Sequence, residues 1–179
     1  MILIPFLFAV PIYSLLIVSD KPYIFSIPLG MLLLLIAYRD LLSFKISNLM
    51  NLAILILGII YNIYIEQSFI APFISFVIAG SFFYLLSFGY FKIRRKQGLG
   101  GGDIKLFACG AVWLSPYLLP LVLLTSSFSA LFYALFLSLL NATEFNSKSK
   151  IPFGPFLGLG LWICWLFGEN IINFISFSS

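Results

Sequence analysis

Two aspartates, Asp40 and Asp103, are the residues of this chain best placed to do chemistry. Each stands at the border between a basic stretch and a long apolar stretch. A carboxylate at the border of a membrane is costly, so we interpret each one first as a candidate functional group. Asp103 also follows four glycines in the five positions 98–102. Glycines let another chain approach the backbone closely, which suggests a carboxylate presented beside a groove.

Each aspartate also has a purely structural explanation. Asp103 could cap the first free N–H groups of a helix. Asp40 could pair with Arg39 or Lys45 in surface salt bridges, which contribute little free energy. Two predicted membrane spans separate the aspartates, so contact between them is a tertiary hypothesis that spacing alone does not establish.

Two carboxylates in a confined site cannot both ionise easily, because each raises the pKa of the other. One can then activate a water as general base while the other protonates the leaving group. This aspartic-protease chemistry needs no histidine or serine in the catalytic site. It also needs no metal or cofactor, and we expect neither in this protein. The chain has no histidine, and Cys109 and Cys164 stand alone in apolar stretches, which supports neither a zinc site nor a redox site. A Ser-Lys dyad with Lys105 as base is a second hydrolytic arrangement, although charge pairing or lipid contact explains Lys105 better.

The composition is that of a membrane protein. Of 179 residues, 62% are hydrophobic and 9% are charged, and the mean hydropathy is +1.13. A spanning helix needs roughly 20 apolar residues, so we expect an all-α polytopic bundle of six or seven transmembrane helices. Residues 1–179 would form a single integral-membrane domain with no separate soluble domain. The net charge of +4 lies in short loops, so it indicates orientation in the bilayer rather than binding to nucleic acid.

Seven apolar runs are expected to form the helices. They are residues 2–19, 22–38, 46–65, 69–91, 103 to about 115, a run that ends near 140, and a last run from 151. We interpret the first as a retained span rather than a cleaved signal sequence. The glycines before Asp103 favour an unwound start of the fifth helix. Boundaries near Pro116, Pro120 and Pro155 are the hardest to place, because proline can end a helix or only kink it.

The basic residues predict the orientation. If the glycine loop is cytoplasmic, nine of the ten Lys and Arg residues are cytoplasmic and only Lys21 is outside, as the positive-inside rule requires. The nine are Arg39, Lys45, Lys92, Arg94, Arg95, Lys96, Lys105, Lys148 and Lys150. The N-terminus is then cytoplasmic and the C-terminus outside. Asp40 ends an inward-going helix and Asp103 starts an outward-going one, so both are expected at the cytoplasmic border.

Three motifs resemble those of one family of membrane proteases. Gly100-Gly101-Gly102-Asp103, followed by Ile104-Lys105-Leu106, is similar to the GxGD motif of membrane aspartyl proteases, and specifically of type IV prepilin peptidases. Asp40 with Lys45-Ile46-Ser47-Asn48 resembles that family's first catalytic aspartate and its basic-Ile-Pro-Asn segment, with Ser47 in place of proline. Pro152-Phe153-Gly154-Pro155 resembles its Pro-Phe-Gly-Pro element. The resemblance covers about residues 30–165.

The resemblance implies a function. Asp40 and Asp103 would be catalytic, and support would come from Gly100, Gly101, Gly102, Lys105, Asn48, Pro152, Gly154 and Pro155. The substrates would be pilin-like precursors with a short basic leader, a glycine before the cut and an apolar helix after it. The enzyme would lie in the lipid bilayer of the inner membrane, with pilus assembly machinery as a further partner. Because the sequence shows no cytoplasmic domain with paired cysteines, it looks like the compact Tad/Flp-type branch without the methyltransferase domain.

Two other functions fit the same residues. One is a GxGD intramembrane protease with unrelated substrates, which the short glycine loop and Gly154-Pro155 suit less well. The other is a non-catalytic membrane subunit or a small transporter, in which Asp40 and Asp103 relay protons or ions. Cleavage of a precursor favours a protease, whereas a proton-dependent flux abolished by Asp103→Asn favours the relay.

Overall fold

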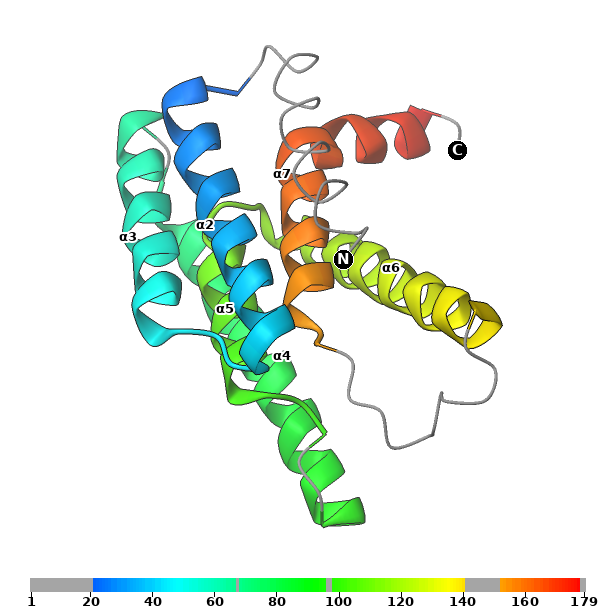
Figure 1. The fold of residues 1–179 in the computed structure, drawn as a ribbon. Coiled ribbons are helices and arrows are strands. Elements are labelled where there is room, and N and C mark those ends of the chain that lie inside the picture. The colour runs from blue at the N-terminus through cyan, green and yellow to red at the C-terminus, as the bar shows by residue number, and fades with distance from the viewer. Residues whose placement is uncertain (1–20, 67, 96–97, 141–151, 178–179) are drawn as a thin grey trace.

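In the computed structural model, which describes residues 21–66, 68–95, 98–140 and 152–177, every regular element is a helix (Figure 1). The elements in chain order are α2 (Tyr23–Ser43), α3 (Asn48–Tyr64), α4 (Ile70–Arg94), α5 (Gly101–Ala111), the 3₁₀ helix η1 (Pro116–Leu118), α6 (Leu119–Leu140) and α7 (Gly154–Phe177). The predicted all-helical class is confirmed.

The number of spans is smaller than predicted among the described residues. Four helices are long and apolar enough to cross a membrane, namely α2, α4, α6 with η1, and α7. Helix α3 has 17 residues and α5 has 11. At about 1.5 Å per residue, α3 reaches roughly 26 Å, at the lower limit for a spanning helix, whereas α5 reaches roughly 16 Å and falls well short of a hydrocarbon core of about 30 Å. The expected first span, residues 2–19, lies outside the described residues.

Prolines set several helix starts. Pro116 opens η1, Pro120 is the second residue of α6, and Pro155 is the second residue of α7. Proline suits a first turn because the missing N–H would have no partner within the helix. All three prolines therefore mark boundaries rather than kinks, whereas Pro28 lies inside α2.

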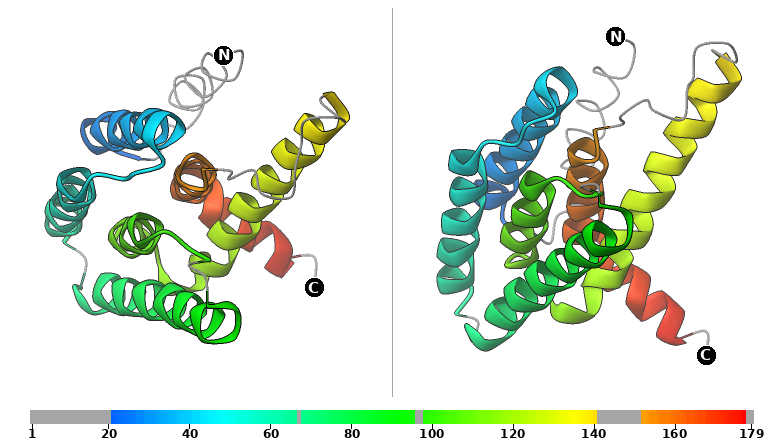
Figure 2. Two further views of the ribbon diagram at one scale, coloured as in Figure 1. Left: turned by 60° about the horizontal axis from the view of Figure 1, so that its bottom comes forward. Right: turned by 90° about the horizontal axis from the view of Figure 1, so that it is seen from below.

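The short helix α5 is the centre of the bundle. It packs against α3, α4 and α7, and α7 packs in turn against α2 and α6. Figure 2 shows α5 surrounded by these neighbours. Leu106 and Phe107 of α5 are almost completely buried, like Ile36 of α2 and Leu157 of α7. This enclosure explains why so short a helix is stable, because most helical stability in proteins comes from tertiary packing.

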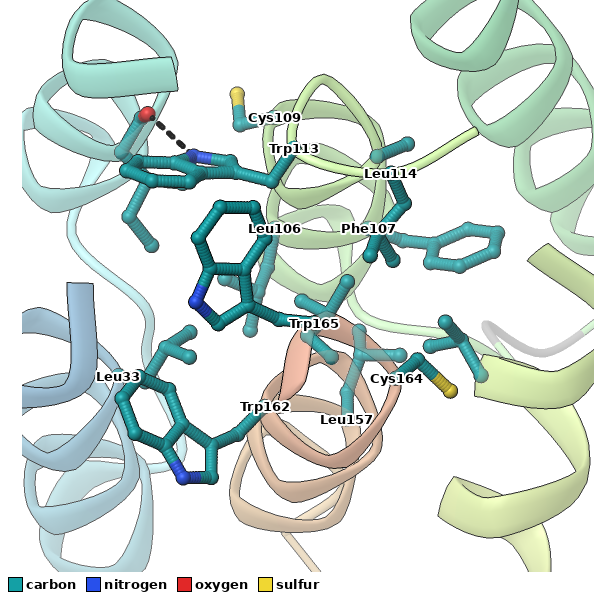
Figure 3. Packing of buried hydrophobic residues seen from close by; sticks show 14 of the residues in the cluster. Leu33, Leu106, Phe107, Cys109, Trp113, Leu114, Leu157, Trp162, Cys164 and Trp165 are labelled. Carbon is teal, nitrogen blue, oxygen red and sulfur yellow. Dashed lines mark hydrogen bonds between the residues drawn. The ribbon is translucent and has the colours of Figure 1, made fainter. Parts of the chain in front are cut away.

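Aromatic side chains pack together at the end of the bundle where α5 ends. Trp113 stacks on Tyr61 with ring centroids 5.4 Å apart, and Trp165 meets both rings edge-on. The indole N–H of Trp113 donates a hydrogen bond of 3.0 Å to the carbonyl of Ile54 in α3. Figure 3 shows Trp113 and Trp165 pointing into the space between the helices. These contacts hold α3, α5 and α7 in a fixed relation.

Candidate active site

Asp40 lies inside α2, because the helix continues past it to Ser43. Its side chain is only 5% exposed. The backbone N–H of Gly154, the first residue of α7, donates a hydrogen bond of 3.0 Å to Asp40 Oδ2. Burial of a carboxylate needs such a donor, so the end of α2 and the start of α7 meet at this residue.

Asp103 is the third residue of α5 and lies in the first turn of that helix. Its backbone N–H donates to the carbonyl of Gly100 at 3.0 Å, and its carboxylate accepts a hydrogen bond from the backbone N–H of Gly100, the N-cap residue. The Oδ1 atom of Asp103 is buried and has no hydrogen-bond partner among the described residues. Asp103 is therefore more than a structural cap, and one of its oxygens is free to accept a proton or bind a water.

The two aspartates act on each other electrostatically. Asp103 lies outside the four spans, and burial is the main cause that raises its pKa from 3.8 to about 6. The negative charge of Asp40 raises this pKa further, while a backbone hydrogen bond from Gly100 lowers it. A charge affects a pKa strongly only at short range. Both carboxylates thus belong to one region at one end of the bundle.

The three glycines before Asp103 have different surroundings. A β-carbon on Gly100 would lie 2.9 Å from Asp103 Oδ2, and one on Gly102 would lie 2.9 Å from the β-carbon of Ile46. A β-carbon on Gly101 would meet nothing within 4 Å. The prediction of an unwound start is wrong, since α5 begins at Gly101 with Gly100 as N-cap. Glycine is about 1 kcal/mol less favourable than alanine within a helix. Packing of α5 against the neighbouring helices outweighs this cost.

Lys105 and Asn48 form a contact between α5 and α3. Lys105 Nζ donates to Asn48 Oδ1 at 2.9 Å, and both residues are exposed. Close by, Asn51 Nδ2 donates to the carbonyl of Gly102 at 3.4 Å. Asn48 and Lys105 are thus brought to the same end as Asp103, where they link the starts of two helices.

The Pro-Phe-Gly-Pro element reaches the same place from the other side. Pro152 is partly buried just before α7, and Gly154 and Pro155 are buried at its start. A β-carbon on Gly154 would lie 2.7 Å from Asp40 Oδ2 and 3.1 Å from Ile46 Cδ1. Gly154 is small because Asp40 occupies the space a side chain would need.

Asn51 lies near the aspartates and was given no role from sequence. It is 2% exposed and its Oδ1 is buried without a partner among the described residues. A polar residue within an apolar run was the available signal for Asn51. Ile46 also lies there, and the sequence indicated it only as part of the basic-Ile-Pro-Asn segment.

A separate cavity of about 560 Å³ lies at the opposite end of the bundle. Its lining includes Lys21, Glu66, Trp165 and Glu169, and neither aspartate. Lys21 Nζ lies 4.9 Å from the centroid of the Trp165 ring. In the described part of the chain, no three Cys, Asp or Glu residues gather as a metal site would require.

Comparison with known proteins agrees with the motifs. Residues 27–135 match the model of the type IV leader peptidase family, described as Peptidase_A24. That range contains Asp40 and Asp103 and ends before Pro152. No solved structure gives a significant match.

Several curated relatives carry the name prepilin leader peptidase/N-methyltransferase. The protein of Dichelobacter nodosus is 31% identical over 118 residues, which cover 65% of this chain and 38% of the relative. The protein of Aeromonas hydrophila is 31% identical over 140 residues, which cover 78% of this chain and 48% of that relative. The protein of Legionella pneumophila is 30% identical over 145 residues, which cover 79% of this chain and 49% of that relative. The chain thus spans less than half the length of these relatives. With a family model that matches more than half of its residues, this helical membrane protein belongs to the type IV leader peptidase family.

Proposed function

We propose that this protein is a prepilin leader peptidase that cuts pilin-like precursors with Asp40 and Asp103 at the cytoplasmic face of the inner membrane. The observation that carries the proposal is that Ile46 lies against both Gly102, the residue before Asp103, and Gly154, the donor to Asp40, which brings the two aspartates to one end of a bundle of this family. They come from helices far apart in sequence, and each stands at a helix end on the same side of the bundle.

The surroundings suggest different roles for the two carboxylates. The N–H of Gly154 donates to Asp40 Oδ2 and holds that carboxylate in place. Asp103 has a buried oxygen that meets no hydrogen-bond partner in the described part of the chain, and its pKa is raised to about 6, mainly by burial. We therefore assign the shared proton mainly to Asp103, with Asp40 as the general base, although the two apparent pKa values belong to the pair.

The chemistry follows from that assignment. Asp40 takes a proton from a water, whose oxygen adds to the carbonyl carbon of the scissile peptide. Asp103 gives its proton to the carbonyl oxygen, which yields a tetrahedral gem-diol. Asp40 then protonates the leaving nitrogen as the C–N bond breaks, and a hydroxyl of the gem-diol returns a proton to Asp103. Each aspartate ends in its starting state, and one water is consumed.

The substrate class follows from the family and from the position of the site. A precursor whose apolar helix lies in the bilayer would present its leader at the membrane surface. The proposed cytoplasmic location rests on the nine-to-one distribution of Lys and Arg. The same arrangement brings the peptide to the end of the bundle that carries Asp40 and Asp103.

Co-expression of the protein with a candidate prepilin tests the proposal directly, with the size of the precursor as the readout. Asp40→Asn and Asp103→Asn should each abolish cleavage at normal membrane levels, because asparagine can neither take nor return the proton. The double variant should be little worse than either single one, since the residues act as a unit. Glu66→Gln, which changes an acid at the opposite cavity, should cleave normally. Processing by Asp103→Asn at near the wild-type rate would overturn the proposal in favour of a proton or ion relay.

A further inference from the structure

The four-residue loop between α2 and α3 folds back onto the candidate site. Phe44 ends α2 in the left-handed conformation with φ of 53°, and its N–H donates to the carbonyl of Asp40 at 2.9 Å. Helices commonly end in this conformation, and here it turns the chain back toward the bundle. Two residues later Ile46 lies partly buried against the core.

The side chain of Ile46 touches the site at both of its ends. Its β-carbon lies 2.9 Å from the position a β-carbon would take on Gly102, the residue before Asp103. Its Cδ1 lies 3.1 Å from the corresponding position on Gly154, whose N–H holds Asp40. One aliphatic side chain therefore extends from the start of α5 to the start of α7.

The geometry points to Ile46 as a positioning residue of the site, a spacer that sets the separation of Asp40 and Asp103 and closes one side of it to water. This inference rests on the proposed function. A β-branched side chain suits the role because its χ1 angle is stiff. The glycine at 102 then serves to admit Ile46, whereas substrate approach is left to Gly101, whose face is open.

Shortening the side chain should change catalysis in steps. Ile46→Val removes Cδ1 and keeps the β-carbon, so its loss in kcat should be at most several-fold. Ile46→Ala removes the contact with Gly154, and its kcat should fall by about 10–100-fold with KM changed much less, because small misplacements of catalytic groups cost about that much. Water entering beside the carboxylates should also lower the upper apparent pKa of kcat/KM. A role in folding alone predicts lower protein levels with an unchanged pH profile.

A matched control separates the spacer from ordinary packing. Leu57 is another partly buried aliphatic residue packed against the core, nine residues along α3 from Asn48. Leu57→Ala should lower thermal stability without shifting the pH profile of the folded enzyme. A shift as large as that of Ile46→Ala would overturn the inference.

A double-variant cycle tests the contact with Gly102. Gly102→Ala should impair cleavage, because the new β-carbon meets the β-carbon of Ile46, which cannot rotate away. Ile46→Gly removes that opposing atom, so the double variant should be no less active than Ile46→Gly alone. Gly89→Ala, in α4, is the control, because a β-carbon there meets nothing within 4 Å among the described residues, so this variant should be mild alone and additive with Ile46→Gly. Full additivity of Gly102→Ala with Ile46→Gly would refute the spacer, while inactive Asp40→Asn and Asp103→Asn variants would leave the proposed function standing.

Discussion

The backbone N–H of Gly154 lies 3.0 Å from Asp40 Oδ2, although 114 positions separate the two residues in sequence. This bond joins the first residue of α7 to the last turns of α2. It satisfies a buried carboxylate with a main-chain donor that every residue except proline would also supply. The activity of variants at position 154 therefore shows how far the Asp40 carboxylate can move before cleavage is lost.

Gly154→Ala should abolish cleavage. Its β-carbon would lie 2.7 Å from Asp40 Oδ2, so the carboxylate has to move and we expect a loss of at least about 100-fold in kcat/KM. Gly158→Ala is the matched control, because it lies one turn later in α7 with its nearest contact at 3.8 Å. The control should cleave at nearly the wild-type rate. Equal activity of the two variants would contradict the tight fit around Asp40.

Lys105→Ala should be mild in comparison. Exposed charged contacts contribute about 1 kcal/mol or less, so the hydrogen bond from Lys105 to Asn48 predicts a loss of activity of no more than about tenfold. Asn48→Ala should have a similar effect, and the double variant should resemble either single one because the same bond is removed. Complete inactivity of a normally inserted Lys105→Ala protein would instead indicate that Lys105 is the base of a Ser-Lys dyad.

The activity should depend on pH through the coupled pair. The reaction needs one protonated and one ionised carboxylate, so kcat/KM should follow a bell with two apparent pKa values. The upper apparent pKa should be near 6, because Asp103, whose pKa is raised to about 6, loses its proton there. A profile of kcat/KM measured from pH 4 to 9 in detergent checks this. A flat profile across pH 5–7 would contradict the assignment of the proton to Asp103.

Asp103→Asn should stabilise the folded protein near neutral pH while it removes activity. The pKa of Asp103 is 3.8 when unperturbed and about 6 in the folded protein, so between these values the folded state binds more protons than the unfolded state. Stability then falls as pH rises through that window, by an amount on the order of 3 kcal/mol. Melting temperatures of wild type and Asp103→Asn should agree near pH 4 and diverge by pH 7. A variant that is less stable at pH 7 would contradict the burial of this charge.

Cysteine labelling tests the orientation in the membrane. Ile93→Cys, at the exposed end of α4, should react only with reagents that enter the cytoplasm, and Ser68→Cys should react from outside. The native Cys109 and Cys164 are buried and give little background. Labelling of Ile93→Cys from the outer face would invert the topology and place both aspartates on the other side.

Sequence patterns identified the polar parts of the site better than its apolar parts. Asp40 and Asp103 stand out because carboxylates are rare in such a chain, and Gly154 stands out by its resemblance to a motif. The contact between Gly154 and Asp40 is a long-range one, which no local pattern encodes. Ile46 was quoted only as part of a motif and given no role of its own, because a single aliphatic residue carries little signal where 62% of residues are hydrophobic.

Helix lengths were less predictable than helix positions. The prolines at 116, 120 and 155 coincide with helix starts, and the all-helical class follows from composition. The fifth apolar run was expected to span, yet α5 ends at Ala111 after 11 residues. Hydropathy measures what a segment can bury, not whether lipid or protein surrounds it, so an enclosed helix resembles a span in sequence.

The shortness of α5 has a consequence for how the protein is made. A segment of 11 residues cannot partition into the bilayer as an independent span, so it depends on enclosure by α3 and α4, which precede it, and by α7, which follows it. Asp40 receives its backbone donor, the N–H of Gly154, only when α7 has been synthesised and docked. A nascent chain that lacks α7 would therefore carry both acidic groups without a finished site.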